Sequence, residues 1–284
     1  MVSSKPELND LVALALREDL GGEMWDSDVT TNLVVDPELK GEAKIIAKSP
    51  GVLSGADAAA RVFEAVRPPC EYFALVPDGA SLEPGQEASR IVGPLGSILT
   101  AERTALNFLQ RLSGIATLTR RYSDALAPYK SAVLLDTRKT TPGLRFLERA
   151  AVRAGGGHNH RAGLWDAILI KDNHVAAAGG VRAAIERARR TGMPVEVEVD
   201  TLAQLDEALA AGAEIVLLDN MSVNDTRRAV EINRGRAKLE ASGGMTLEGA
   251  VAAAKAGVDR ISVGALTHSA PALDLSLEVT KTWR

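Results

Sequence analysis

Five side chains suited to binding an anion stand in three short segments in the middle of the sequence: Arg138, Lys139, His160, Arg161 and Lys171. Each segment borders an apolar run, which places these residues at predicted strand ends. Cations crowded together repel one another and lose hydration, so a cluster of them is favoured when anions bind among them. Ion pairs with neighbouring acids would explain any one arginine equally well. Four strong cations at strand ends nevertheless favour a site for a multiply charged anionic substrate.

Two acidic residues, Glu198 and Asp219, end neighbouring predicted strands, so we expect their carboxylates to lie close together. Hard oxygen ligands suit Mg²⁺, which usually takes one or two carboxylates together with oxygens of the substrate. The pair therefore predicts a Mg²⁺ site. A structural alternative is that both acids neutralise Lys139 and Lys171, and the two interpretations are compatible.

Two glycine-containing loops follow the last two predicted strands, Ser242-Gly243-Gly244 and Gly264-Ala265. Backbone N–H groups at a helix start bind phosphate, and paired loops of this kind occur in phosphate-binding barrels. A glycine pair alone also makes a tight turn. Two such loops on consecutive final strands favour a phosphate site.

The pair His158-x-His160 would suit a transition metal, but no third soft ligand is evident nearby. His160 precedes Arg161, and we interpret it as a donor to a substrate carboxylate or phosphate. Cys70 is the only cysteine, which excludes an internal disulfide and a Cys-pair metal site. No activating partner is evident, so we interpret Cys70 as a structural thiol.

The elements that must position these groups form a regular series. Apolar runs predict strands at residues 133–136, 167–170, 195–199, 214–218, 238–241 and 260–263. Helical patterns lie between them, which predicts a parallel sheet, either a closed barrel or an open doubly wound sheet. In residues 195–200 three acids alternate with three valines, so one face of this strand must look into a polar space. This favours the barrel, because a buried parallel strand is normally apolar on both faces. Active sites of such barrels lie at the C-terminal strand ends.

The first part of the chain has a different pattern. A helix is predicted from residue 8 and ends at Gly21-Gly22, strands are predicted at 43–48 and 72–76, and helices at 56–66 and 98–112. This mixture predicts an α+β layer. The change of pattern near residue 113 predicts a boundary between two domains.

The bulk properties of the 284 residues limit the function. Apolar residues make up 46% and charged residues 25%, which is typical of a globular protein. The net charge of −4 gives no general attraction to nucleic acid or to an anionic membrane, so a basic site must be local. No apolar run approaches the roughly 20 residues of a membrane helix. Residues 1–6 lack the apolar core of a secretory signal, so we expect a cytoplasmic protein without a membrane partner.

Three segments, residues 136–143, 155–161 and 170–174, closely resemble the motifs of the quinolinate phosphoribosyltransferase family, also called nicotinate-nucleotide pyrophosphorylase (carboxylating). Further matches follow in the same order along nearly the whole chain: residues 101–107, 113–117, 218–221, 240–244 and 262–266. Two departures stand out. Glu148-Arg149-Ala150-Ala151-Val152 replaces the usual Glu-Lys-Tyr-Ala-Val, and a short insertion lies between Gly21 and Asp28. These put a helix packing and a loop in doubt, but not the strand-end residues.

The resemblance implies the type II phosphoribosyltransferase fold, an α/β barrel with an N-terminal α+β sandwich domain. The N-terminal domain would comprise residues 1–113 with the tail 269–284 packed back on it, and the barrel residues 114–268. The implied reaction transfers the phosphoribosyl group of phosphoribosyl pyrophosphate to quinolinate with decarboxylation. Its products would be nicotinate mononucleotide, pyrophosphate and CO₂, in the biosynthesis of NAD.

The resemblance also implies roles for single residues. Arg138, His160, Arg161 and Lys171 would hold the quinolinate carboxylates, and Lys139 would face the pyrophosphate. Glu198 and Asp219 would hold the ribose hydroxyls and Mg²⁺. The 5′-phosphate would be bound by Ser242, Gly243, Gly244, Gly264 and Ala265. Lys139, Lys171, Glu198 and Asp219 would be the catalytic residues. Arg103 would enter from a second subunit, which implies a homodimer with a shared active site.

Three other functions are open to this set of residues. A relative acting on nicotinate would need no decarboxylation, although the basic cluster favours two substrate carboxylates. A Schiff-base lyase would use Lys171 as nucleophile, but three further cations crowd that position. A non-catalytic protein that binds a sugar phosphate would have no use for the full set of acids and bases.

Overall fold

The computed structural model describes residues 5–22 and 27–284. The predicted absence of a secretory signal at residues 1–6 and the insertion at residues 21–28 fall partly outside the described residues. The chain forms two compact units. The N-terminal unit takes in the described residues up to Arg120 with 141–156 and 270–284, and the barrel unit takes in residues 121–140 and 157–269.

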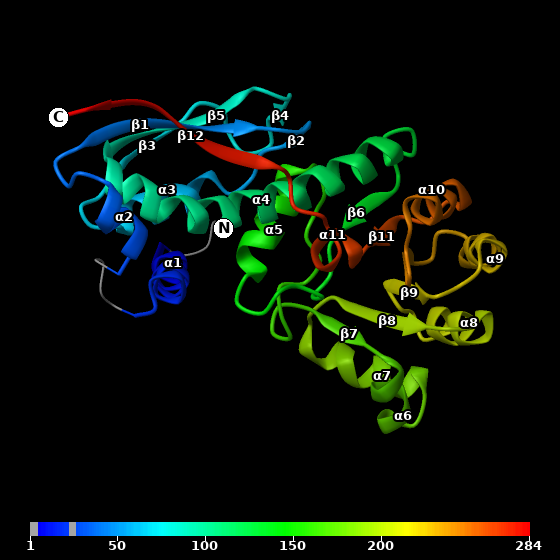
Figure 1. Ribbon diagram of the computed structural model, residues 1–284. Coiled ribbons are helices and arrows are strands. Elements are labelled where there is room, and N and C mark those ends of the chain that lie inside the picture. Colours follow the sequence, from blue (N-terminus) through cyan, green and yellow to red (C-terminus); the bar gives the residue numbers. More distant parts are fainter. Residues whose placement is uncertain (1–4, 23–26) are drawn as a thin grey trace. The chain divides into compact units, whose positions relative to one another are not determined.

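The N-terminal unit is built on an antiparallel four-stranded sheet in the order β12-β1-β5-β3 (Figure 1). Its strands are β1 (Lys40–Ala47), β3 (Glu71–Ala74), β5 (Glu87–Pro94) and β12 (Leu275–Trp283), and a small second sheet pairs β2 (Gly51–Val52) with β4 (Ser81–Leu82). Every second residue of β1 is buried, so one face of the sheet lies on the core. The last strand, β12, runs antiparallel to β1, so the end of the described chain belongs to the N-terminal sheet.

The helices of this unit are α1 (Lys5–Leu20), α2 (Val29–Val34), α3 (Ala56–Ala65), α5 (Arg145–Ala154) and α4 (Leu95–Leu126), of which the part up to Arg120 belongs to it. The helix α4 continues through the boundary that the sequence predicts near residue 113. The helix predicted at residues 98–112 is therefore shorter than α4, and Gly114 lies inside the helix. A Cβ at Gly114 would collide with the carbonyl oxygen of Pro271, so the glycine permits a close chain approach and ends nothing.

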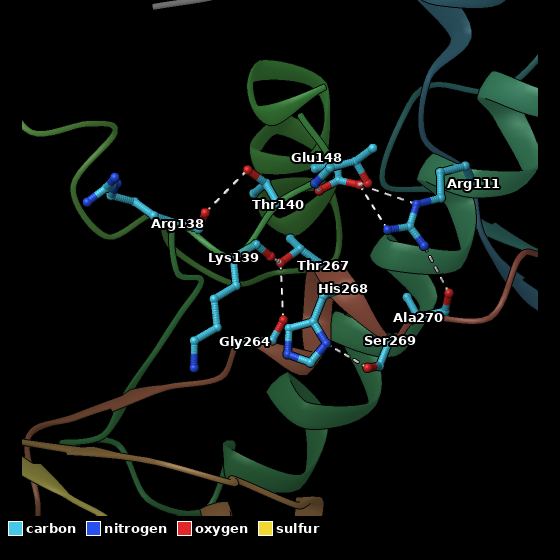
Figure 2. Close-up of polar contacts among 11 residues, drawn as sticks. Arg111, Arg138, Lys139, Thr140, Glu148, Gly264, Thr267, His268, Ser269 and Ala270 are labelled. Atoms are coloured by element: carbon cyan, nitrogen blue, oxygen red, sulfur yellow. Dashed lines mark hydrogen bonds and ion pairs between the residues drawn. The ribbon is translucent and has the colours of Figure 1, made fainter. Parts of the chain in front are cut away.

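The departure at residues 148–152 forms part of α5 and packs well. Glu148 is fully buried, and its carboxylate accepts a hydrogen bond from Arg111 Nη2 over 2.9 Å (Figure 2) and one from Thr141 Oγ1 over 2.8 Å. Ala151 and Val152 are also fully buried. The buried acid is therefore compensated by a cation and a hydroxyl, as a buried carboxylate must be.

The barrel unit contains a six-stranded parallel sheet, and every strand predicted in this part of the sequence is present. The strands are β6 (Val133–Leu135), β7 (Ile168–Ile170), β8 (Val195–Val199), β9 (Ile215–Asp219), β10 (Lys238–Ser242) and β11 (Arg260–Ser262). Their order is β6-β11-β10-β9-β8-β7. Each strand from β7 to β11 lies beside its successor and β11 lies beside β6, whereas a doubly wound sheet reverses its order part-way. The winding is that of a barrel, which confirms the predicted fold class.

The helices of the barrel unit connect these strands (Figure 1). They are α6 (Asp172–Ala178), α7 (Val181–Ala188), the short 3₁₀ turn η1 (Arg189–Thr191), α8 (Leu202–Ala210), α9 (Val223–Asn233), α10 (Leu247–Ala256) and α11 (Ala265–His268). The edge strands of the sheet are β6 and β7, and between them in sequence His158 forms a parallel bridge with Leu135.

Register assigns the side chains of the sheet to two faces. Val197, Val216, Leu239 and Ile261 share one face of the sheet and are almost fully buried. On the other face, Glu198 is in register with Leu217, Leu217 with Glu240, and Glu240 with Arg260. Because registered residues of parallel strands point to the same side, the inner face of the sheet is charged. This confirms the polar space predicted from the alternation in residues 195–200.

Among the described residues, no helix has both the length and the apolar character needed to cross a membrane.

Candidate active site

The predicted site residues of the barrel unit lie at the C-terminal edge of its sheet. Arg138 and Lys139 follow β6, Lys171 directly follows β7, and Gly264 follows β11. The acids lie on neighbouring strands: Glu198 is the second-last residue of β8, and Asp219 is the last residue of β9. Ser242 is the last residue of β10 and is in register with Asp219. The edge therefore gathers cations, acids and a glycine loop, as the sequence predicts.

Lys139 is held by its backbone, and its side chain lies along Gly264. Thr267 Oγ1, fully buried, donates to the carbonyl oxygen of Lys139 over 2.7 Å. A Cβ at Gly264 would lie 3.0 Å from Lys139 Cδ. Figure 2 shows Thr267 beside the backbone of Lys139, and it shows the side chains of Arg138 and Lys139 pointing apart. Two consecutive cations therefore serve two different places of the rim.

Arg161 lies close enough to Arg138 for their charges to interact. Burial lowers the pKa of the Arg161 guanidinium, and the positive charge of Arg138 lowers it further. The Arg161 Nη1 also donates to the carbonyl oxygen of Ala167 over 3.3 Å. Two cations held near each other in a partly buried place create a strong preference for an anion between them.

Lys171 and Glu198 form an ion pair across the rim, with Lys171 Nζ 2.5 Å from Glu198 Oε2. Lys171 is the next residue after Ile170, which is in register with Val197, so the pair follows from the sheet register. The structural alternative stated for Glu198, neutralisation of a lysine, is therefore present. It uses one carboxylate oxygen of Glu198, and a carboxylate has a second one to offer.

The loop Ser242-Gly243-Gly244 is tied to the end of β9. The backbone N–H of Asn220 donates to the carbonyl oxygen of Ser242 over 3.0 Å. Gly243 has a φ of +94°, and a Cβ there would collide with Asn220 Oδ1, so only glycine fits. The loop leads into α10, whose N-cap Thr246 accepts a hydrogen bond from the Gly249 N–H over 3.1 Å. Residues 242–246 also line a cavity of about 140 Å³.

His160 differs from the other predicted residues because its ring points to acids of the inner face. Its Nε2 lies 3.1 Å from Glu196 Oε2 and 3.3 Å from Glu240 Oε1. Burial alone would lower the pKa of His160, but hydrogen bonds and charge from the two carboxylates raise it to about 9. The Arg161 N–H opposes this rise, since it donates to Nδ1 over 2.7 Å and needs that nitrogen without a proton. We therefore assign the ring the Nε2–H tautomer.

Hydrogen bonds to a buried acid also hold the loop that carries His160. Asp136, fully buried at the end of β6, accepts the backbone N–H of His160 over 2.7 Å and the side-chain amide of Asn159 over 2.6 Å. Sequence reasoning assigned no role to Asp136, Glu240, Arg260 or Thr267, although all but Arg260 lie in or beside the motifs that carry the resemblance.

Arg103 lies on α4 within the N-terminal unit, so the shared site implied by the resemblance stays a prediction.

Comparison with known proteins identifies the family. The model of the N-terminal domain of quinolinate phosphoribosyl transferase matches residues 28–113, and that of its C-terminal domain matches residues 115–278. The chain belongs to the quinolinate phosphoribosyltransferase family. The family expected from the motifs is thereby confirmed.

Relatives of this phosphoribosyltransferase family match almost the full chain. The nicotinate-nucleotide pyrophosphorylase [carboxylating] of Mycobacterium leprae is 46% identical over 277 residues, covering 95% of this chain and 96% of the relative. The probable enzyme of the same name from Bacillus subtilis is 42% identical over 277 residues, covering 96% and 94%. The solved structure of nicotinate-nucleotide pyrophosphorylase from Francisella tularensis has a TM-score of 0.88 at 43% identity, covering 96% of this chain and 97% of that chain.

His160 also belongs to a group of side chains that could bind a metal ion. Within the described residues, the group of metal-ligand side chains close enough together is His160, Glu196 and Glu240, whose ligand atoms lie within 4.8 Å of one another. His158 is exposed and not part of it. The Arg260 Nε lies 3.1 Å from Glu240 Oε2. The guanidinium therefore already supplies positive charge to Glu240.

For this member of the phosphoribosyltransferase family, we expect Gly243→Ala to lower the free energy of unfolding by more than about 2 kcal/mol, because the new Cβ clashes with Asn220. Gly244→Ala is the matched control. Gly244 has a φ of +50° and open space around it, so alanine there costs about 1 kcal/mol of backbone strain. Urea unfolding of both variants checks the difference, and equal losses would contradict the proposed close approach.

Proposed function

We propose that this protein transfers the phosphoribosyl group of phosphoribosyl pyrophosphate to quinolinate and decarboxylates the product to nicotinate mononucleotide. The observation that carries the proposal is the family match over both domains, residues 28–113 and 115–278. The chemistry of the rim supports it independently. A dicarboxylate, a phosphate and a pyrophosphate all need cations or N–H donors, and the rim offers both.

The carboxylates of quinolinate are best served by Arg138, Arg161 and Lys171. Arg138 and Arg161 repel each other in the free protein, so binding of a dianion between them relieves an unfavourable interaction. Guanidinium groups also bind carboxylates through two parallel hydrogen bonds, which orients a flat ring. Lys171 has an exposed ammonium, paired with Glu198, from which it can turn to a substrate anion.

The phosphoribosyl pyrophosphate is assigned to the other part of the rim. Lys139, which points away from Arg138, faces the pyrophosphate (Figure 2). The N–H groups of Ser242, Gly243 and Gly244, with Gly264 and Ala265, bind the 5′-phosphate. Backbone donors suit this group because they bring partial positive charge without the reach of a long side chain.

The donor set at the ends of β8 and β9 fits Mg²⁺. Glu198 and Asp219 offer carboxylate oxygens from the same face of the sheet, and no sulfur or imidazole ligand stands with them in the register. We assign Glu198 and Asp219 to Mg²⁺ and the ribose hydroxyls. When bound, the ion would supply positive charge to the pyrophosphate oxygens.

The transfer step forms a bond between the ring nitrogen of quinolinate and C1 of the ribose, while the bond from C1 to pyrophosphate breaks. Pyrophosphate takes the bonding electron pair, and Lys139 stabilises its growing negative charge. Glu198 and Asp219 favour the positive charge that develops on the ribose. The ring nitrogen is then positive, so the electron pair left on the adjacent carbon when CO₂ departs is stabilised until a proton adds there.

Product analysis tests the proposal. With quinolinate, phosphoribosyl pyrophosphate and Mg²⁺, we expect nicotinate mononucleotide and CO₂ in equal amounts. Chromatography measures the mononucleotide, and the release of label from labelled quinolinate measures CO₂. Nicotinate serves as the parallel substrate and should give no product. Turnover of nicotinate without turnover of quinolinate would contradict the named reaction while leaving the family intact.

The metal assignment gives a second prediction. Asp219→Asn and Glu198→Gln should each reduce kcat by on the order of a hundred- to thousandfold and raise the Mg²⁺ concentration needed for half-maximal rate. Asp200→Asn is the control, because Asp200 is exposed just beyond the same strand end as Glu198. Unchanged Mg²⁺ dependence in both variants would count against their role as ligands.

We also propose that the active protein is a homodimer with Arg103 completing the partner's site. Mixed Arg103→Ala and Lys139→Ala proteins, each inactive alone, should then recover about a quarter of the normal activity, since half the dimers are hybrids with one intact site each. Activity is measured after subunit exchange has been verified with labelled chains. No recovery after exchange would refute a shared site.

A further inference from the structure

Both ring nitrogens of His160 are engaged by the protein itself. Nε2 lies 3.1 Å from Glu196 and 3.3 Å from Glu240, and Nδ1 accepts the Arg161 N–H over 2.7 Å. The side chain is 10% exposed. An imidazole has two hydrogen-bonding positions, so this ring has none left for a substrate carboxylate.

The acids beneath the ring depend on it. Glu240 is fully buried, and its carboxylate lies between His160 and Arg260, whose Nε is 3.1 Å away. Glu196 is 6% exposed in its side chain and faces the same ring nitrogen. A buried carboxylate without a partner is strongly destabilising. The ring is therefore a structural part of the inner face of the barrel.

The same residue fixes the loop above. Asp136 accepts the backbone N–H of His160, and the ring of His160 accepts the backbone N–H of Arg161. Both contacts act on the peptide units on either side of His160. They set the direction in which the next side chain leaves the chain, and that side chain is Arg161, placed within charge interaction of Arg138.

We infer that His160, Glu196 and Glu240 are positioning residues: the two acids seat the imidazole in the barrel, and the seated ring aims Arg161 at the substrate beside Arg138. The inference revises the role that the resemblance implied for His160. It rests on the proposed function only for the identity of the ligand, quinolinate.

The first test needs no ligand and uses the whole protein. Long-range ¹H–¹⁵N spectra of histidine-labelled protein report which ring nitrogen carries the proton, and His160→Gln assigns the signal among the four histidines. We expect a protonated Nε2 and a bare Nδ1, unchanged when quinolinate is added. A ring protonated on Nδ1, or one that changes tautomer on addition of quinolinate, would overturn the inference.

The second test separates direct contact from positioning. His160→Ala should weaken quinolinate binding about tenfold in the normal protein but less than about twofold in Arg161→Gln, because the histidine acts through the arginine. A direct contact would instead multiply the two losses. Isothermal titration with quinolinate gives the dissociation constants, and circular dichroism checks that each variant is folded.

Conservative variants complete the design and serve if His160→Ala fails to fold. His160→Gln retains an N–H donor for the two acids and should bind quinolinate several-fold more tightly than His160→Ala; equal losses would favour direct contact. Glu240→Gln, buried away from any ligand, should weaken binding about tenfold by loosening the seat. Unchanged affinity of Glu240→Gln for quinolinate would refute the role of Glu240 in positioning the His160 ring. Failure of the unsubstituted protein to bind quinolinate would refute the proposed function. The ¹H–¹⁵N measurement of the His160 tautomer would still decide whether the two acids position the ring.

Discussion

Charges on the inner face of a parallel sheet must be compensated where they stand, and this constraint organises the barrel unit. Glu196, Glu240 and Arg260 lie on that face, with His160 reaching in from a loop. In water such ion pairs contribute little, but in a buried place the loss of one partner leaves an uncompensated charge. On this part of the inner face, Arg260 pairs with Glu240, and the Nε2–H of His160 faces both acids.

The cations of the candidate site lie at the C-terminal edge of the same sheet. Burial and the positive charge of Arg138 lower the pKa of Arg161, and the backbone of Lys139 is held by Thr137 and Thr267. Positive charge is therefore concentrated where the strands end, which favours the binding of an anion there. One alternation of charged and apolar residues along the strands therefore places buried charges on the inner face, where stability requires their compensation, and charged groups at the strand ends, where an anion can bind.

Much of this arrangement could be predicted from sequence, and the misses have physical reasons. The alternation of acids and valines in residues 195–200 is long enough to reveal a polar inner face. The strand containing Arg260 has three residues, and in the strand containing Glu240 a charge of opposite sign, Lys238, lies on the same face, so periodicity could not single out either residue. Asp136 and Thr267 act on backbone groups of distant segments, which no local pattern records. The close approach of Pro271 to Gly114 likewise joins residues far apart in sequence, so no local pattern predicts it.

The loop with His160 shows why residue type alone misassigns a role. A histidine beside an arginine at a strand end is chemically suited to bind a carboxylate, and the motif encouraged that interpretation. Two features decide otherwise: the ring has only two polar positions, and the nearest buried acids lie on alternate positions of β8 and on β10. Because those acids face Nε2 and the next peptide donates to Nδ1, the guanidinium groups are the donors left for the proposed recognition of a second substrate carboxylate. In the proposed site, a monocarboxylate would leave the repulsion between Arg138 and Arg161 only partly relieved, so charge as well as shape would discriminate quinolinate from nicotinate.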